Sequence, residues 1–563
     1  MRNAICQPTD NNIFSAQNIG RCKKYVVTIQ RRLDKAVAND DKPKIRCFLH
    51  LLTIRSRAAK VLATYKITKV NEGRYTAGVD KVAIPREKEE QEAVRLRLYQ
   101  EIDTSRKPTP IRRVFIPKPN GKLRPLGIPT LPDRITQEII RQAIEPVCEY
   151  HFHGSSQGFR PKRSCQDAMS EVFNKLGKRT SRQWVIEGDI KGCFDNINHN
   201  YITNTLKSWH ITDGINQTVG QMLKSKLFYD GNITDSETGT PQGGVISPLL
   251  ANVALTSLDD FCQQFGRKYR KYTVSPIVRY ADDFVIVCEN EQEAELIKAK
   301  VAQHLKENLG LELSDKKTHI THISKGFNFL GFNFRKYRSK ESDSDDEKVL
   351  LIKPQAEKVG NFRYKLKNIL KVVSSQDVIQ KLNSVITGWG MYYRHVVSKV
   401  IFSRLDSDIW KKLYLWSKRR HPNKPTGQTV EKYFSTNRKR KWEFKDKTGK
   451  TARRLSTIPI KRFIKINNDH RVYDVKSKEY WEMREYQKAK ESILGSGVLS
   501  ALFGKQKGKC AYCKQPFTKA EINSVESHET TFKRWRCKVK QPKTTPRILS
   551  PRHSRNIYEE GNE

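Results

Sequence analysis

The sequence lacks the features of a membrane or exported protein. No apolar run approaches the roughly 18 residues that a membrane-spanning helix needs. The first six residues contain no apolar core of a signal peptide. Eleven cysteines are mostly scattered singly, as in reduced cytosolic proteins, and only Cys510 and Cys513 have the spacing of metal ligands. These absences predict a cytoplasmic protein without a membrane partner.

Acidic residues are scarce relative to basic ones. The 60 Asp and Glu residues are outnumbered by 106 Lys and Arg, which gives a formal net charge of +46. Solubility does not require such an excess, so it predicts a large polyanionic partner. Nucleic acid is the first expectation, and an anionic membrane surface is the rival. A chain of 563 residues is also too long for one core, so several domains are expected.

Two adjacent carboxylates, Asp282 and Asp283, stand between two apolar runs. The runs at 277–278 and 284–287 are β-branched and predict a β-hairpin with both acids at its tip. Adjacent acids repel each other and need a counter-charge, for which a divalent metal ion is the usual one. Taken alone, the segment fits an acidic surface turn equally well, because Asp is common in turns.

A second predicted strand, at 185–189, also ends in an acid, Asp189. If the two strands pair side by side, Asp189 meets Asp282. Three carboxylates on neighbouring strand tips can hold two Mg²⁺ ions, an arrangement that serves in-line phosphoryl displacement. The two segments together therefore point to phosphoryl-transfer chemistry.

A basic hairpin is predicted before both acid-bearing strands. Its strands are at 112–118 and 123–129, with an Asn-Gly turn between them. Such a hairpin places Lys118 and Arg124 where they can clamp a triphosphate. A solvated basic hairpin without a ligand is the alternative.

Four helical segments are predicted from apolar residues at three- and four-residue steps, at 24–66, 133–150, 164–176 and 292–309. A glycine-rich segment at 240–248 lies between the two acid-bearing strands. Its paired glycines allow the backbone to approach a ligand closely.

Basic and aromatic residues alternate in the segment 411–470. It contains 19 Lys and Arg against 4 Asp and Glu. Positive charge gives affinity for phosphate, and aromatic rings can stack on unpaired bases. The aromatic residues can equally form a small core. Before this segment, the polar run at 338–348 predicts a solvated loop and a domain boundary.

Six blocks along the chain resemble, in the same order, those of bacterial-type group II intron-encoded proteins, which are reverse transcriptases and maturases. The blocks are Arg-Val-Phe-Ile-Pro-Lys at 113–118, Gln-Gly-Phe-Arg at 157–160, Asp-Ile-Lys at 189–191, Thr-Pro-Gln-Gly-Gly at 240–244, Tyr-Ala-Asp-Asp at 280–283 and Gly-Phe-Asn-Phe-Leu-Gly at 326–331. Two further segments, at 388–394 and 419–424, resemble the family's thumb, or X, domain. The resemblance covers residues 24–495 and is highly specific.

The resemblance implies a catalytic centre. Asp189, Asp282 and Asp283 match the metal-binding carboxylates, with Asp189 and Asp282 touching both Mg²⁺ ions. Lys317 matches the basic residue that protonates the leaving pyrophosphate.

The resemblance also implies a nucleotide site. Lys118 and Arg124 match the fingers residues that hold the incoming triphosphate. Phe194 matches the bulky residue that excludes a 2′-hydroxyl and so selects dNTPs over rNTPs. Gln242 matches the residue that packs against the nucleotide sugar and the template base. Each role has a physical reason, since cations meet developing phosphate charge and bulk beside the ribose discriminates by clash.

The C-terminal tail departs from the family pattern. The family often ends in a zinc-supported His-Asn-His endonuclease with two cysteine pairs and a His-His pair. Cys510 and Cys513 begin that pattern, but His528 lacks its histidine neighbour, and Cys537 and His553 stand alone. Half a zinc site is a weak signal. The tail is therefore expected to be a degenerate endonuclease region without DNA cleavage, and zinc binding by the two cysteines stays open.

The implied fold is an α/β right-hand polymerase of fingers and palm, with an α-helical thumb or maturase domain and a small basic C-terminal domain. The expected ranges are a helical N-terminal extension at 1–80, fingers and palm at 81–340, thumb at 345–424, a basic DNA-binding domain at 425–495 and the degenerate tail at 505–563.

The implied function is RNA-directed DNA synthesis by a two-metal mechanism, together with binding of group II intron RNA to aid splicing and support of intron mobility. The expected partners are intron RNA, an RNA template with a DNA primer, dNTPs and target DNA. A non-mobile domesticated reverse transcriptase and a non-enzymatic RNA-binding splicing factor are the alternatives. The intact set of three carboxylates favours the enzyme, because a pure splicing factor has no need of it. The expected location is cytoplasmic and bacterial in type, and an organelle stays open.

Overall fold

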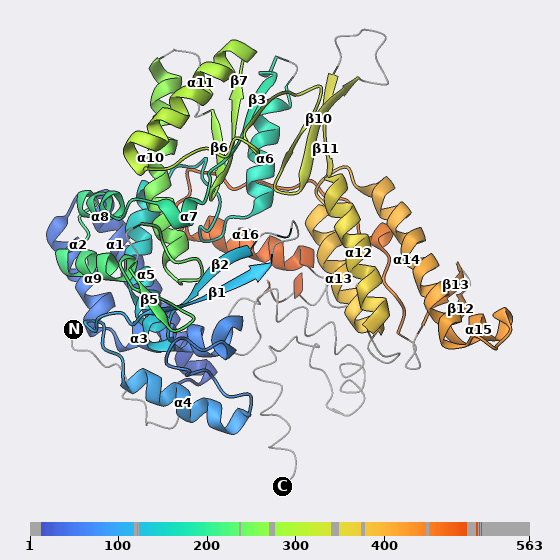
Figure 1. Cartoon of the computed structure of the whole chain (residues 1–563), viewed down its shortest axis with the longest axis horizontal. Helices are drawn as coiled ribbons and strands as arrows, with labels where there is room; N and C mark the ends of the chain where they lie inside the picture. Colours follow the sequence, from blue (N-terminus) through green and yellow to red (C-terminus); the bar gives the residue numbers. More distant parts are fainter. Residues whose placement is uncertain are drawn as a thin grey trace. The chain divides into compact units, whose positions relative to one another are not determined.

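The computed structural model describes residues 13–117, 121, 123–178, 180–235, 238–268, 276–338, 348–372, 378–437, 440–445, 450–492, 503–504, 506 and 508. The chain divides into two compact units. Figure 1 shows the helices and strands of both units with their labels. Unit 1 consists of residues 1–151, 207–234 and 468–563, and unit 2 consists of residues 152–206 and 235–467. Within the described ranges, no helix has both the length and the apolar character needed to cross a membrane.

Unit 1 is mainly helical and carries one small sheet. Its elements are α1 (Ala16–Ala38), α2 (Lys42–His50), η2 (Leu51–Arg55), α3 (Arg57–Tyr65), η3 (Lys66–Val70), η4 (Glu72–Tyr75), α4 (Lys88–Gln100), β1 (Ile111–Pro117), β2 (Leu123–Ile128), α5 (Leu131–His151), α9 (Asp213–Leu223), β4 (Leu227–Tyr229), β5 (Asn232–Thr234) and α16 (Lys478–Ser492). The sheet order is β2-β1-β4-β5. Helix α1 begins where the Ser15 side chain accepts a hydrogen bond from the backbone N–H of Asn18. Its buried stripe of Ile19, Val26 and Leu33 then packs inward.

Three predictions for unit 1 are confirmed. Strands β1 and β2 form the antiparallel hairpin expected around residue 120, with Ile116 opposite Arg124. Helix α5 covers the helix expected at 133–150 and is buried along nearly its whole length. Helices α1 to α3 likewise account for the helical pattern at 24–66.

The C-terminal part of unit 1 is attached to its N-terminal helices by polar contacts. Arg471 forms an ion pair with Asp34 of α1 (Nη2 to Oδ2, 3.1 Å), and the buried Tyr473 hydroxyl donates to Glu145 of α5 at 2.6 Å. The range 425–495, expected to be one basic domain, is therefore divided: residues up to 467 belong to unit 2 and those from 468 belong to unit 1.

Unit 2 begins with a four-stranded sheet that carries the acidic residues. Its elements in this part are α6 (Cys165–Leu176), β3 (Trp184–Asp189), α7 (Cys193–Asn196), α8 (His199–Ser208, whose last two residues fall in unit 1), α10 (Ser247–Lys268), β6 (Ile277–Tyr280), β7 (Asp283–Cys288), α11 (Glu291–His304), η5 (Leu305–Leu309) and β8 (His319–His322). The sheet order is β6-β7-β3-β8, and every neighbouring pair is antiparallel. Five successive residues of β7 are buried, which means that both faces of this strand are covered. The predicted hairpin at 277–287 and the predicted helices at 164–176 and 292–309 are confirmed.

The rest of unit 2 is a helical region attached to a second sheet. It comprises β9 (Phe327–Phe329), β10 (Phe332–Arg338), β11 (Lys348–Pro354), α12 (Ala356–Val372), α13 (Val378–Tyr393), α14 (Lys399–Arg420), α15 (Thr426–Tyr433), β12 (Phe434–Asn437), β13 (Arg440–Phe444) and η6 (Leu455–Thr457). Strands β10 and β11 pair on either side of the polar run at 338–348, most of which lies outside the described residues.

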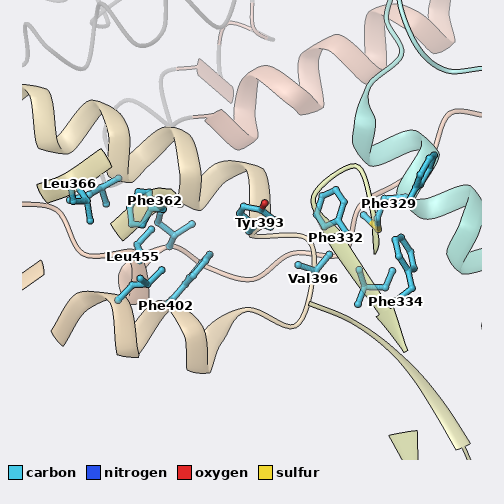
Figure 2. Packing of buried hydrophobic residues seen from close by; sticks show 14 of the residues in the cluster. Phe329, Phe332, Phe334, Phe362, Leu366, Tyr393, Val396, Phe402 and Leu455 are labelled. Atoms are coloured by element: carbon cyan, nitrogen blue, oxygen red, sulfur yellow. The ribbon is translucent and has the colours of Figure 1, made fainter. Parts of the chain in front are cut away.

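One hydrophobic core joins these helices to the sheet (Figure 2). Phe332 and Phe334 of β10 lie at one end, and Phe362 of α12 and Phe402 of α14 lie at the other. Tyr393 of α13 lies between them and donates a hydrogen bond to the Gly331 carbonyl at 3.1 Å. The aromatic block predicted at 326–331 therefore helps to anchor the helices on the sheet.

Candidate active site

The two adjacent acids lie at a tight turn between β6 and β7. Tyr280 is paired with Asp283, so only Ala281 and Asp282 lie in the turn. Ala281 adopts the left-handed conformation (φ 58°), which is uncommon for a residue with a Cβ. This compact turn holds Asp282 beside the first residue of β7.

Strand pairing brings the third acid to the same place. Strands β3 and β7 are antiparallel, and Asp189 is opposite Asp283. The two-residue turn starts β7 at Asp283, so Asp283 is the residue directly opposite Asp189, and Asp282 is the turn residue next to it. Directly opposite residues project from the same face of a sheet, so the Asp189 and Asp283 carboxylates are neighbours.

The close strand pairing depends on a glycine next to Asp189. A Cβ on Gly188 would lie 2.1 Å from Cζ of Phe284, whose ring is only 1% exposed. The ring therefore occupies the space that a side chain at position 188 would need. Only glycine permits this packing beneath the acidic site.

The pKa of Asp283 is raised to about 7, by removal of its carboxyl from bulk water and by the charges of Asp282 and Asp189. Asp283 is an exposed residue, so the two neighbouring charges contribute more to its raised pKa than burial does. The raised pKa means that too little positive charge lies nearby to stabilise the ionised form of Asp283.

Lys317 supplies part of that missing charge. Its Nζ atom lies 3.0 and 2.9 Å from the two carboxylate oxygens of Asp189. The hydrogen bond to Asp189 raises the pKa of the Lys317 amine, and the charges of the other two acids act in the same direction. The side chain is 67% exposed, so it can leave this position without opening a cavity.

The three carboxylates fit a divalent cation in chemistry. Mg²⁺ prefers carboxylate oxygens as ligands. A bound ion would also neutralise the mutual repulsion of the acids, which raises the pKa of Asp283. Among the described residues, however, no group of three or more His, Cys, Asp or Glu side chains is already arranged to hold a metal ion. The metal-binding role of Asp189, Asp282 and Asp283 therefore stays a prediction.

The glycine-rich loop packs on the segment that follows Asp189. The backbone N–H of Thr240 donates to the carbonyl of Phe194 at 2.5 Å, and a Cβ on Gly239 would lie 2.5 Å from the Asp195 backbone. Gln242 donates through Nε2 to Oδ2 of Asp195 at 3.1 Å. The structure thus brings Gln242 and Phe194, two predicted nucleotide-binding residues, to one place in unit 2.

Phe194 also meets an aromatic residue from another segment. Its half-buried ring packs edge-to-face against the Phe159 ring, with 6.1 Å between ring centroids. Phe159 is 51% exposed and adopts a left-handed backbone conformation. The predicted block at 157–160 therefore contacts Phe194, one of the predicted nucleotide-binding residues.

Four further residues were predicted for the site or for zinc binding. Arg124 lies exposed on β2 of unit 1. Lys118, Cys510 and Cys513 lie outside the described residues, so their predicted roles stay predictions.

Sequence reasoning missed Arg279, which lies on β6 two residues before Ala281 of the acidic turn. Its side chain is fully buried and forms an ion pair with Asp259 of α10. The available signal was a single charged residue inside an otherwise apolar strand, since a buried charge requires a partner.

Three family models match the chain. The model described as "Reverse transcriptase (RNA-dependent DNA polymerase)" matches residues 116–334, "Group II intron, maturase-specific domain" matches 359–434, and "N-terminal domain of reverse transcriptase" matches 16–96. The first match contains Asp189, Asp282, Asp283 and Lys317.

Individual proteins are similar as well. Protein YkfC of Escherichia coli is 34% identical over 389 residues, which cover 62% of this chain and 98% of YkfC. Group II intron-encoded protein LtrA of Lactococcus lactis is 32% identical over 45% of this chain and 53% of LtrA, so the alignment spans about half of that relative. A telomerase structure from Candida albicans aligns with 60% of this chain and 64% of that chain at 13% identity, with a TM-score of only 0.34.

Proposed function

This chain belongs to the family of group II intron-encoded reverse transcriptases and maturases, and from that premise we propose that it synthesises DNA on an RNA template and binds a group II intron RNA. The observation that carries the polymerase proposal is the pairing of Asp189 with Asp283 directly beside Asp282. The family generally uses Mg²⁺, and the three acids are the residues that would hold it. When bound, two such ions would lower the negative charge of the reacting phosphates and activate the primer hydroxyl.

The residues around the acids would position and select the nucleotide. The Phe194 ring would stand beside the sugar and exclude a 2′-hydroxyl by clash, and Gln242 would support the sugar and template base from the other segment. Support for this arrangement comes from the contacts of the Gln242 loop with the Phe194 carbonyl and the Asp195 carboxylate.

Lys317 would act after the nucleotide has bound. Before that step its ammonium group neutralises Asp189. We propose that it is then released from the acid and donates its proton to the leaving pyrophosphate. Arg124 of β2, together with Lys118, would hold the triphosphate through charge-assisted hydrogen bonds.

The helical region from α12 to α15 would bind the intron RNA. Its support is the maturase-specific match and the exposed basic residues of α14, among them Lys411, Lys418 and Arg419. Residues 425–467 would extend this surface toward target DNA, which narrows the DNA-binding domain expected at 425–495. A zinc ion at Cys510 and Cys513, the degenerate endonuclease tail at 505–563 and a cytoplasmic location stay predictions.

Primer extension tests the polymerase proposal. The full chain, given an RNA template, a DNA primer, dNTPs and Mg²⁺, is expected to lengthen the primer. Chelation of the metal with EDTA should stop synthesis, and added Mg²⁺ should restore it, because the acids need a cation before they tolerate the triphosphate. Extension that continues at an unchanged rate in excess EDTA would contradict the proposal.

A further inference from the structure

Arg279 lies on β6, two residues before Ala281 of the acidic turn, and is fully buried. Its Nε atom lies 3.0 and 3.1 Å from the two carboxylate oxygens of Asp259, which is also fully buried. Its Nη1 atom donates to Oδ1 of Asn252 at 2.9 Å. Asp259 and Asn252 are two turns apart on α10 and therefore share a face of that helix. The guanidinium group is thus fixed by one helix.

The same guanidinium group reaches the turn itself. Nη1 of Arg279 also donates to the carbonyl of Ala281 at 3.1 Å. A peptide unit is planar, so fixing this carbonyl fixes the plane of the peptide that joins Ala281 to Asp282. It also holds Ala281 in a left-handed conformation that its Cβ disfavours.

A loop from an earlier segment clamps the other side of the turn. The backbone of Arg279 is bonded on both sides, from its N–H to the Ser155 carbonyl at 3.0 Å and from the Gln157 N–H to its own carbonyl at 2.9 Å. The next residue, Gly158, lies so close that a Cβ would be 2.4 Å from the Ala281 nitrogen. Asn252 completes the link by donating to the Gly158 carbonyl at 2.8 Å.

We propose that Arg279, held by Asp259 and Asn252, is a positioning residue that sets the direction of Asp282 through the Ala281 carbonyl. A purely structural ion pair would need only the Asp259 contact. The bond to Ala281 gives the network a second task, because Asp282 lies one planar peptide away. This inference rests on the proposed metal-binding role of Asp282 and adds the residues that orient its side chain.

The test separates positioning from folding by replacing the buried pair with apolar residues. A buried ion pair can often be exchanged for apolar residues of similar volume without loss of folding. In the full chain, Arg279→Met with Asp259→Leu should therefore melt close to the wild-type temperature. Affinity for Mn²⁺, measured by electron paramagnetic resonance with primer–template bound, should fall about ten-fold or more, as on loss of other groups that orient metal ligands. We expect kcat for primer extension to fall with it, while KM for the dNTP and the affinity for primer–template stay unchanged.

A matched control asks whether removal of any buried pair has this effect. Arg471→Met with Asp34→Leu removes an ion pair from unit 1 and should leave Mn²⁺ affinity unchanged. Wild-type Mn²⁺ affinity in the Arg279 and Asp259 double variant would overturn the proposal. If that variant does not fold, Arg279→Lys provides the test, because lysine keeps the charge but lacks the planar group of several donors that arginine has. Weaker Mn²⁺ binding by this variant would support the positioning role, and wild-type binding would overturn it. Because the primary readout is Mn²⁺ binding, absence of DNA synthesis by the wild type would contradict the proposed function without deciding this one.

Discussion

Phe194 lies in the segment that follows Asp189 and contacts two other segments of unit 2. Its ring packs against Phe159, and its backbone carbonyl accepts a hydrogen bond from the Thr240 N–H. Its ring is half-buried, so one part packs against neighbouring residues and the other part is exposed. Phe194→Ala would remove the bulk beside the sugar. We expect incorporation of rNTPs relative to dNTPs to rise about ten-fold or more, the range in which pockets discriminate by one small group.

Competition between each dNTP and the matching rNTP on one template measures that ratio. Phe194→Tyr is the matched control, since it keeps the ring and should keep the wild-type preference. An Ala variant with the wild-type preference would show that the Phe194 ring has no part in sugar selection.

At the scale of single residues, the sequence predicted that the three acids lie close together, but it did not predict the buried residues that hold the acidic turn. Asp189, Asp282 and Asp283 follow apolar strands, and the strand pairing places Asp189 and Asp283 opposite each other beside Asp282. The role of Arg279 was not predicted, because its partners Asp259 and Asn252 are on a helix whose placement depends on tertiary packing. No local pattern states which buried charge will meet which acid.

At the scale of elements, the antiparallel pair of β3 and β7 is the part on which the site depends. Gly188 leaves space for the Phe284 ring between the strand and the core. Gly188→Ala would force the ring or the strand to move, and overpacking of this kind typically costs about 1–3 kcal/mol. The urea midpoint of unfolding should therefore fall.

Gly360 provides the comparison for that experiment. It lies within α12, and a Cβ there would meet nothing within 4 Å. Gly360→Ala should raise stability by roughly 0.5–1 kcal/mol, because alanine loses less backbone entropy in a helix. Equal midpoints for the wild type and Gly188→Ala would show that the strand pair is not closely packed at this position.

Elements could be predicted where their pattern was strong. The two hairpins and helix α5 follow from alternating or periodic apolar residues. The register of the strands could not be predicted in this way. It is set by the two-residue turn, which places Asp283 directly opposite Asp189. The contacts of Arg471 and Tyr473 with α1 and α5 were also not predicted, because the acidic partners of these two residues are far away in sequence.

At the scale of the whole molecule, the charge of +46 is the dominant property. Affinity for intron RNA is expected to fall steeply as salt rises, because binding releases the counterions of the RNA. Replacing Lys411, Lys418 and Arg419 of α14 together by Gln should lower the slope of log affinity against log salt by roughly 0.7–0.9 for each RNA phosphate that these side chains neutralise in the wild type. Filter binding over a salt series measures the slope, and an unchanged slope would contradict an RNA surface on α14.

Point variants are preferable here to removal of residues 345–495. That deletion begins immediately before β11, the partner of β10, and it also removes Arg471 and Tyr473, which contact α1 and α5 within unit 1. Loss of RNA binding would then report damage to both units as much as loss of a binding surface.

The most direct test of the account is Asp282→Asn in the full chain, assayed side by side with the wild type. The change keeps the size of the side chain but removes the negative charge that a metal ion needs. We predict that primer extension on RNA is abolished while the affinity for intron RNA stays close to that of the wild type. Asp213→Asn, an exposed acid at the start of α9 in unit 1, should extend normally. Extension by Asp282→Asn at the wild-type rate would contradict the assignment of the acidic turn as the catalytic centre.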